Sequence, residues 1–515
     1  MSSAPNPTAP ASSATASSAP ATREAAAMSV RHAAVWAMAG QYISFAIMFA
    51  NSVIISRFFL TPAEIGLFSI ALAASMVAAV LQDFGLSRYI AGLRVVDAEA
   101  LSRCASVAFL FSFVVAGIIA ASAWPMALTY HQKALFPILL IIAASYLFVP
   151  LSVVPMALMG RTMSFHGHFC VNVGGAVALA GSALTLSALG LSSFALAWAT
   201  LIAAIARAAI AQALRPAAPW PLRTDGVRPI MANGAKLTTL YGIGALGSRT
   251  PDMILGKILG LVSVGLYSRA AGLSDQFRML ISGAIGQVFY PAFARIRDAG
   301  EPLGPAYLRV CAGYSAIIWP SMAGLALAAG PVVRLLYGPR WEAAAPLLSL
   351  ISLTEVLLIS LPLVSDLPIL LGRANRLIAL NLVDTAMSVS LMIAGCHWGV
   401  QGAAASRLLY GAASLVLYGR FMQGLVGFGV GRLLAIYARS AAAALAAVVP
   451  LAATYRFWVS AADISLLQLL LASGAGVLCW LATLALLRHP ALDDLLGIAR
   501  HMAGAVLPRL RVRAS

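Results

Sequence analysis

The sequence predicts an all-α polytopic membrane protein with about 14 transmembrane helices. Three observations support this fold class: the composition, a series of long apolar runs, and the distribution of basic residues between those runs. Of the 515 residues, 61% are hydrophobic and only 10% are charged, and the mean hydropathy is +0.90. Soluble domains carry charges on about a quarter of their residues. A soluble multidomain chain is therefore excluded.

The chain opens with a polar segment, 1–32, that precedes the first apolar run. Its first thirty residues are rich in Ser, Ala, Pro and Thr and contain almost no large apolar side chain. Such a segment cannot bury enough apolar surface to offset the entropy lost on ordering. It also lacks the basic start and apolar centre of a secretory signal. We expect a disordered cytoplasmic tail.

Fourteen apolar runs follow, each about the length that a helix needs to cross a bilayer. Their approximate ranges are 33–56, 65–85, 104–123, 135–158, 168–189, 193–214, 234–258, 263–290, 308–330, 344–371, 375–396, 400–421, 432–453 and 465–487. A break rich in Pro and Arg, 215–233, is interpreted as a cytoplasmic linker. The expected parts are an N-terminal lobe (33–214), a C-terminal lobe (234–424), two extra helices (432–487) and a basic cytoplasmic tail (488–515).

The basic residues define one orientation for these helices. Of the 34 Lys and Arg residues, 22 fall on the side that holds both termini, including five within two residues of that end of a predicted span; five fall on the other side, and the remaining seven lie within the predicted spans. Positive residues are retained on the cytoplasmic side, so we expect both termini to be cytoplasmic. The net charge of +17 is thereby explained without a nucleic-acid partner.

Signatures of several other functions are missing from the sequence. There is no GxxxxGK[ST] motif for ATP hydrolysis. No loop is long enough for a catalytic domain, and the five cysteines lie singly, without a CxxC pair or a His/Cys cluster. We therefore expect no catalytic residues, no cofactor and no metal.

Two short stretches at equivalent points of the two halves indicate an internal repeat. Gly66-Leu67-Phe68-Ser69 opens the second predicted helix, and Gly265-Leu266-Tyr267-Ser268 opens the eighth, 199 residues later. Six helices separate the two stretches, so the halves have the same orientation. Parallel repeats related by an axis along the membrane normal are typical of transporters.

Further stretches carry a family pattern over roughly 33–425. They are Leu60-Thr61-Pro62-Ala63-Glu64-Ile65-Gly66-Leu67-Phe68, Asp83-Phe84-Gly85-Leu86, DMILGKILGLVSVGLYSRA (252–270), Phe289-Tyr290-Pro291-Ala292 and LLYGPRWEAAAPLLSLIS (335–352). In this order and spacing they resemble the polysaccharide transporter (oligosaccharide flippase) family of the multidrug/oligosaccharidyl-lipid/polysaccharide exporter superfamily.

The resemblance implies two six-helix lobes around a central cavity, plus two C-terminal helices. It also implies that the protein moves a polyprenyl diphosphate-linked oligosaccharide from the cytoplasmic to the periplasmic leaflet by alternating access. The expected location is the bacterial inner membrane, and the expected pathways are exopolysaccharide, capsule or O-antigen (lipopolysaccharide) assembly. Polymerase and export components of the same pathway are possible partners.

Basic residues within the predicted seventh and eighth helices are the candidates for substrate binding. A charge at mid-bilayer costs roughly 2.5–3.5 kcal/mol, so it needs a partner or a wet cavity. Arg suits phosphate because its planar fork donates two parallel hydrogen bonds. The predicted cationic cavity comprises Arg249, Lys257, Arg269 and Arg278. The alternative is that these residues form structural ion pairs or reach the membrane interface.

Acidic residues in the spans are candidates for ion pairing or for coupling to an ion gradient. Asp252 lies three residues after Arg249, and Asp275 lies three before Arg278, so each pair shares a helix face. Three further acids lie in the predicted tenth and eleventh helices: Glu355, Asp366 and Asp384. Eleven residues are close to three turns, so Glu355 and Asp366 are expected on one stripe.

Two other functions compete with the flippase hypothesis. A cation-coupled multidrug or small-molecule exporter of the same superfamily would favour a cavity dominated by carboxylates, whereas helices seven and eight hold more Arg and Lys than acid. A membrane polysaccharide polymerase or acyltransferase is an enzyme, and a polymerase would be expected to carry a large periplasmic loop. We therefore expect a transporter and not an enzyme.

Overall fold

The computed structural model describes residues 30–82, 86, 89–90, 97–217, 225–227, 231, 250–282 and 286–492. These residues form helices joined by short turns, and none of them is in a strand. Eleven of the described helical segments are long and apolar enough to cross a membrane. The all-α polytopic class is confirmed, while the number 14 stays a prediction.

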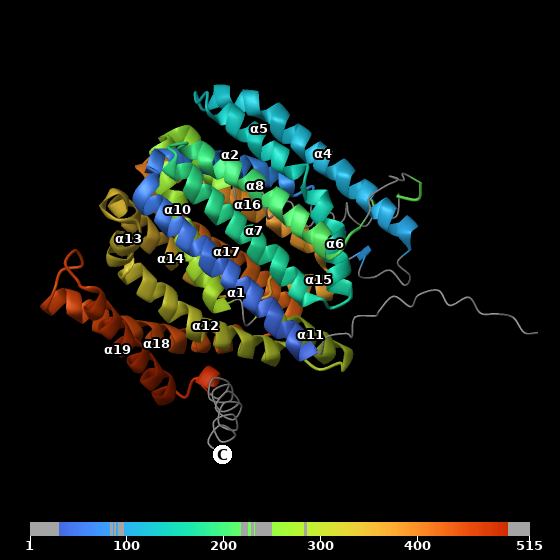
Figure 1. Cartoon of the computed structure of the whole chain (residues 1–515). Helices are drawn as coiled ribbons and strands as arrows, with labels where there is room; N and C mark the ends of the chain where they lie inside the picture. Colours follow the sequence, from blue (N-terminus) through green and yellow to red (C-terminus); the bar gives the residue numbers. More distant parts are fainter. Residues whose placement is uncertain are drawn as a thin grey trace, which may run out of the picture.

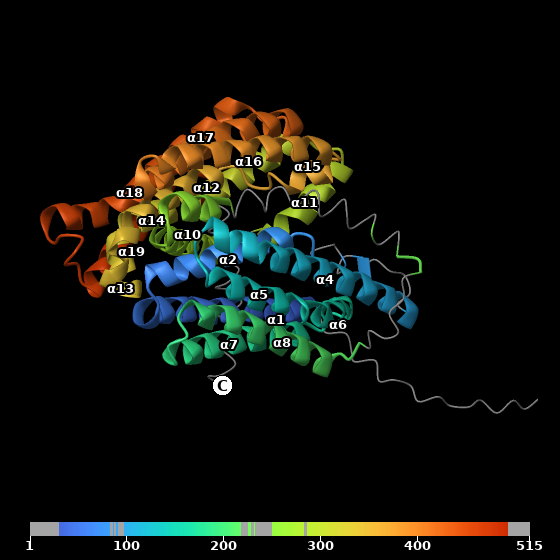
Figure 2. The same cartoon turned by 90° about the horizontal axis from the view of Figure 1, so that it is seen from above.

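The helices of the first half, labelled in Figure 1, lie together on one side of the molecule in the view of Figure 2. They are α1 (Val30–Ile54), the π-helix η1 (Ile55–Phe59), α2 (Pro62–Ala79), α4 (Ala98–Thr129), α5 (Leu135–Tyr146), α6 (Val149–Arg161), α7 (Phe165–Ala188) and α8 (Ser193–Leu214). Most of the predicted linker, 215–233, lies outside the described residues.

The second half forms the other side (Figure 2). Residues 250–259 are helical, and the following elements are α10 (Leu261–Ser282), α11 (Gly286–Asp298), α12 (Leu303–Leu327), α13 (Ala329–Tyr337), the 3₁₀-helix η2 (Pro339–Ala344), α14 (Ala345–Leu358), α15 (Asp366–Leu370), α16 (Ala374–Cys396) and α17 (Gly399–Val426). Two more helices, α18 (Val430–Phe457) and α19 (Leu466–Leu486), pack against each other, and α18 packs on α12.

Two predicted spans are interrupted in the structure. The predicted helix 344–371 is wrong as a continuous element, because α14 ends at Leu358 and turns separate it from α15. Pro362 lies in these turns, where it cannot donate a backbone hydrogen bond to a continuing helix. The predicted helix 135–158 likewise divides into α5 and α6 just before Pro150. The described residues of the predicted 263–290 belong to α10 and α11, and 283–285 lie outside the described residues.

The start of α2 shows how local sequence sets a helix boundary. The Thr61 hydroxyl accepts from the Glu64 amide, and the Glu64 carboxylate accepts from the Thr61 amide at 2.7 Å. This capping box satisfies amides that the first helical turn leaves unpaired. Pro62 at the first helical position already has the backbone φ that a helix needs. The helix therefore begins three residues before the predicted position.

The two repeat stretches pack directly against each other. A Cβ atom on Gly66 would lie 1.9 Å from the Leu261 carbonyl oxygen, and one on Gly265 would lie 1.8 Å from that of Pro62. Each carbonyl belongs to the residue four positions before the other glycine, so the contact is symmetric. Beside it, the Ser69 hydroxyl donates to that of Ser268 at 3.0 Å. The sequence repeat therefore corresponds to a close crossing of α2 and α10.

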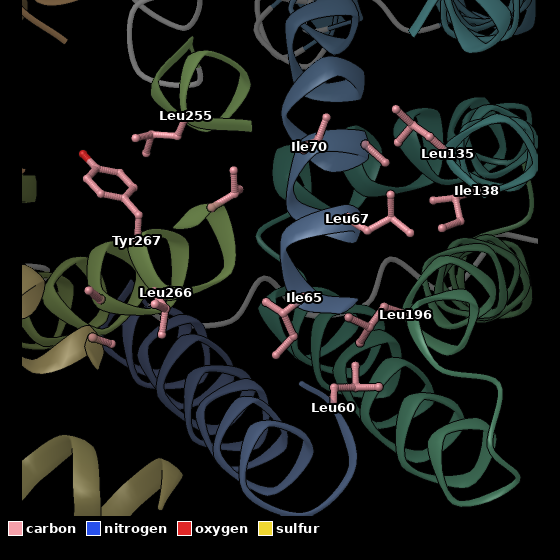
Figure 3. Packing of buried hydrophobic residues seen from close by; sticks show 14 of the residues in the cluster. Leu60, Ile65, Leu67, Ile70, Leu135, Ile138, Leu196, Leu255, Leu266 and Tyr267 are labelled. Atoms are coloured by element: carbon pink, nitrogen blue, oxygen red, sulfur yellow. The ribbon is translucent and has the colours of Figure 1, made fainter. Parts of the chain in front are cut away.

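Buried apolar side chains surround this crossing (Figure 3). Ile65, Leu67 and Ile70 of α2 belong to one core cluster with residues of α5 and α10. At the end of the bundle where η1 continues α1, here called the η1 end, more contacts join the halves. The fully buried Trp341 donates its indole N–H to the Ser56 carbonyl at 2.8 Å, and Arg57 donates to that of Leu335. The halves are firmly joined at the η1 end.

Candidate functional site

A cavity of about 790 Å³, here called the central cavity, lies between the two halves. Helices α1, α2, α7 and α8 line it from the first half. Residues 251–252 and helices α10, α14 and α17 line it from the second half. The α2–α10 crossing forms part of its wall, since both Ser69 and Ser268 belong to the lining. The packing of the two repeat stretches therefore places α2 and α10 in the wall of the central cavity.

Six charged side chains line the central cavity among the described residues, and all come from the second half: Asp252, Arg269, Asp275, Arg278, Glu355 and Arg407. Five of them are predicted site residues, and the structure brings these five together. Arg407 is one of the seven basic residues within the predicted spans but is not among the predicted site residues. Its charge inside an apolar helix was the signal that could have assigned it.

Arg278 is held by two carboxylates from different helices. It pairs with Asp275 on its own helix, which confirms the predicted three-residue pairing. Its Nε also lies 3.3 Å from Oε2 of Glu355, on α14. A positive charge in the span is thus neutralised by acids on both sides, which lowers the cost of placing it there.

Arg269 and Arg407 make hydrogen bonds to hydroxyl groups. Arg269 Nη1 donates to the Ser52 hydroxyl of α1, and its Nε is buried without a hydrogen-bond partner among the described residues. Arg407 Nη1 donates to the Ser388 hydroxyl at 2.9 Å, and its guanidinium carbon lies 4.6 Å from the Tyr410 ring centroid. Neither guanidinium forms an ion pair with a carboxylate among the described residues, so both groups can attract an anion.

The other predicted site residues lie elsewhere. Lys257 donates to the Thr129 carbonyl at 2.7 Å, at the η1 end. Asp366 is exposed at the start of α15, and the break after α14 means that it shares no helix stripe with Glu355, so that prediction is wrong. Asp384 accepts hydrogen bonds from Tyr410 and Ser414, between α16 and α17. Arg249 lies outside the described residues.

A second cavity of about 840 Å³, here called the apolar cavity, adjoins the central one. It is bounded by α1, α10, α12, α13, α18 and α19, and its described lining contains no charged residue. Phe45 and Phe49 of α1 and Leu469 of α19 are typical of its wall. Gln276 of α10 lines both cavities. Within the described residues, no His, Cys, Asp and Glu cluster could hold a metal ion.

Solved structures share this architecture. The chain aligns with the lipid II flippase MurJ in an inward closed conformation at a TM-score of 0.68 and 12% identity, covering 90% of this chain and 100% of that one. It aligns with a multidrug resistance MATE family transporter at a TM-score of 0.54 and 15% identity, covering 76% and 98% of the two chains. At these identities the likeness establishes the fold alone.

Several sequence relatives are named as biosynthesis proteins for polysaccharides or lipopolysaccharide. The chain is 29% identical to the lipopolysaccharide biosynthesis protein WzxC of Escherichia coli over 25% of its own length and 27% of WzxC. It is 28% identical to the amylovoran biosynthesis protein AmsL of Erwinia amylovora over 31% of its own length and 43% of AmsL. The matches thus span less than half of each relative.

A family match covers more of the chain. Residues 54–346 match the family described as "Polysaccharide biosynthesis protein". This range runs from the end of α1 to the start of α14 and includes the α2–α10 crossing. Since the match extends over more than half of the 515 residues, the chain belongs to the polysaccharide biosynthesis protein family.

Proposed function

We propose that this membrane protein is a flippase that moves a polyprenyl diphosphate-linked oligosaccharide across the bilayer. One observation carries the proposal: a charged cavity and an uncharged one of similar size meet at Gln276. A lipid-linked glycan has an anionic diphosphate next to a long hydrocarbon chain. It would place the diphosphate among the arginines and the hydrocarbon in the apolar cavity.

The diphosphate would interact chiefly with Arg269 and Arg407. Each donates a hydrogen bond to a hydroxyl group and forms no ion pair among the described residues, and Arg269 keeps a donor without a partner there. Charge-assisted hydrogen bonds from a guanidinium to phosphate are about twice as strong as neutral ones. They would replace the water that a diphosphate loses when it leaves the membrane surface. Arg249 and Lys257 remain predicted contacts for the same group in other conformations of the protein.

Movement would proceed by alternating access of the central cavity. The contacts between the halves at the η1 end, such as Trp341 with Ser56 and Lys257 with Thr129, support a closed state of that end. The distribution of basic residues favours a periplasmic η1 end and cytoplasmic termini. The glycan would then enter from the cytoplasm. The site of action would be the bacterial inner membrane, in assembly of exopolysaccharide, capsule or O-antigen with the polymerase and export components of that pathway.

The decisive experiment measures the lipid-linked glycans of a deletion strain. We expect complete repeat units on polyprenyl diphosphate to accumulate on the cytoplasmic face, and the intact gene to reverse this. The Arg269→Gln variant should not reverse it at an equal amount of membrane protein. Absence of accumulation together with unchanged surface polysaccharide would overturn the flippase proposal.

A cation-coupled exporter is the second candidate, because three carboxylates also line the central cavity. It predicts a different phenotype from the same deletion strain. Surface polysaccharide would stay unchanged, while susceptibility to cationic compounds would rise and would depend on Asp252, Asp275 or Glu355.

A further inference from the structure

A third cavity, of about 440 Å³, lies within the first half between α1 and α7, and we call it the α1–α7 cavity. Arg207 reaches it from α8. Its polar lining also includes Gln41, Ser44, His168 and Asn172, with the aromatic Trp36 beside them. This number of polar groups in membrane helices calls for a wet space or a polar ligand.

The α1–α7 cavity continues the central cavity towards the opposite end of the bundle. On α1, Gln41 and Ser44 line the new cavity, Met48 lines both, and Ser52 lines the central one. Spacings of three, four and four residues keep all four on one helix face. On α7, Asn172 lines the α1–α7 cavity and Leu179 lines the central one; on α8, Arg207 lines the α1–α7 cavity and Thr200 the central one. Each of the three helices thus presents one continuous face to both cavities.

Arg207 is directed into this cavity by a glycine on the neighbouring helix. A Cβ atom on Gly175 would lie 2.3 Å from Arg207 Nε and 2.5 Å from its Cγ, which is far closer than atoms can pack. The side chain therefore crosses α7 only because residue 175 has no side chain. The glycine at position 175 and the packing of α8 on α7 therefore place the Arg207 guanidinium in the α1–α7 cavity.

The chemistry of the lining favours an amphipathic, uncharged or acidic ligand. No carboxylate lines the cavity among the described residues, so a cation is disfavoured. Among the described residues, the Ser44 hydroxyl and His168 Nε2 are buried and have no hydrogen-bond partner, and such groups require an explanation. The Trp36 ring packs edge-on against Phe169, with centroids 5.1 Å apart, which fixes its orientation. A sugar ring has hydroxyls for the polar groups and a C–H face for the aromatic ones.

We propose that the α1–α7 cavity is a glycan subsite that binds a sugar unit of the lipid-linked oligosaccharide, with Arg207 donating to its hydroxyl or acidic substituents. The inference rests on the proposed flippase function and specifies where the glycan lies. Ser44 and Gln41 precede Ser52 by eight and eleven residues, which is about 12–16 Å along a helix. The subsite therefore binds sugars distal to a diphosphate held at Arg269.

The test uses the glycan without its lipid. Mild acid releases the oligosaccharide repeat unit from the polyprenyl diphosphate lipids of the deletion strain. Its binding to the full chain in nanodiscs is then measured by calorimetry and saturation-transfer NMR. We expect Arg207→Gln to weaken binding about tenfold, the loss of one charge-assisted hydrogen bond. Gly175→Ala keeps the arginine but displaces it, and should weaken binding similarly.

One variant serves as a matched control. Gly181 is on the same helix, and among the described residues no atom outside its own helical turn lies within 4 Å of an added Cβ, so Gly181→Ala should bind the glycan as the wild type does. Thermal melting of each variant separates loss of folding from loss of binding.

The outcomes distinguish this inference from the proposed function. If reconstituted wild-type protein moves lipid-linked glycan across vesicles but does not bind the released repeat unit, the subsite proposal is overturned alone. It is also overturned if Arg207→Gln and Gly175→Ala both bind like the wild type. If the wild type moves no lipid-linked glycan, the flippase proposal itself fails.

Discussion

The two halves of the chain line the central cavity with different chemistry. The second half contributes all six charged side chains of the described lining, whereas the first half contributes hydroxyl, amide and apolar groups such as Ser52, Asn51 and Phe68. The same halves meet symmetrically at Gly66 and Gly265. The repeat therefore preserves the packing of the helices while the chemistry of the cavity has diverged.

Equivalent positions on α2 and α10 show this divergence residue by residue. At the repeat offset of 199, Ser268 corresponds to Ser69, and the two are hydrogen-bonded. One residue further, Arg269 corresponds to Ile70, which is fully buried. Arg278 corresponds to Ala79. In the central cavity, an anionic diphosphate would thus be held by charges of the second half, whereas the first half presents neutral groups to it.

The largest expected effect comes from removing a positive charge that the second half contributes to the central cavity. Arg269→Gln should lower transport of lipid-linked glycan at least about tenfold, because a charged hydrogen bond contributes roughly 1.5–3 kcal/mol. The matched first-half variant, Thr200→Val, should change transport less than about twofold. Transport is measured in reconstituted vesicles at equal protein content. Equal losses in both variants would contradict a diphosphate site formed by the charges of the second half alone.

The next effect tests the shared packing. Gly66→Ala and Gly265→Ala should each destabilise the protein by about 1–3 kcal/mol, because the added methyl group overlaps a carbonyl oxygen of the opposite helix. Gly313→Ala on α12, where no atom lies within 4 Å of the added group, should not destabilise. Thermal unfolding in detergent measures all three. Clearly unequal losses at the first two positions would show that the crossing is not symmetric in energy.

A smaller effect is expected from removing the charge of Glu355, the carboxylate of α14 that pairs with Arg278 of α10. Glu355→Gln removes one of two carboxylates from Arg278, and partly exposed ion pairs contribute at most about 1 kcal/mol. Transport should therefore change less than about fivefold. A near-complete loss, with residual transport that no longer responds to an imposed proton gradient, would instead assign Glu355 a coupling role.

The smallest effect concerns His489, which follows α19 and is buried. Its Nε2 lies 3.1 Å from the Ser440 hydroxyl, which in turn lies 2.8 Å from that of Ser315. Burial, and secondarily the charge of Arg439, lower the pKa of His489 below 6.5. The unfolded chain then binds more protons than the folded one as pH falls below about 6.5, so stability is lost there.

Thermal unfolding at pH 7.5 and pH 5.5 checks this sign. The wild type should lose more stability on acidification than His489→Gln, which has no titrating ring. An equal loss in both proteins would show that the carboxylates, and not this histidine, determine the pH response.

The α-helical membrane class could be predicted because hydropathy and helix breaks are local properties of the chain. Asp275 and Arg278 were predicted as a pair for the same reason, since three residues on one helix define a common face. The break after Leu358 was missed because an apolar run with one proline resembles a kinked span until the turns around it are seen. The role of Lys257 was equally hidden, since its carbonyl partner belongs to Thr129, 128 residues away.

The sequence by itself determined the polytopic helical class, the repeat and the set of charges that lie within apolar helices. Only the tertiary structure decided that Glu355 reaches Arg278 from α14, that Arg269 donates to Ser52, and that Gln276 joins two cavities. The physical reason is the range of the interactions. Hydropathy and helical spacing act within one turn or one span, whereas the chemistry of a cavity depends on which distant helices pack together.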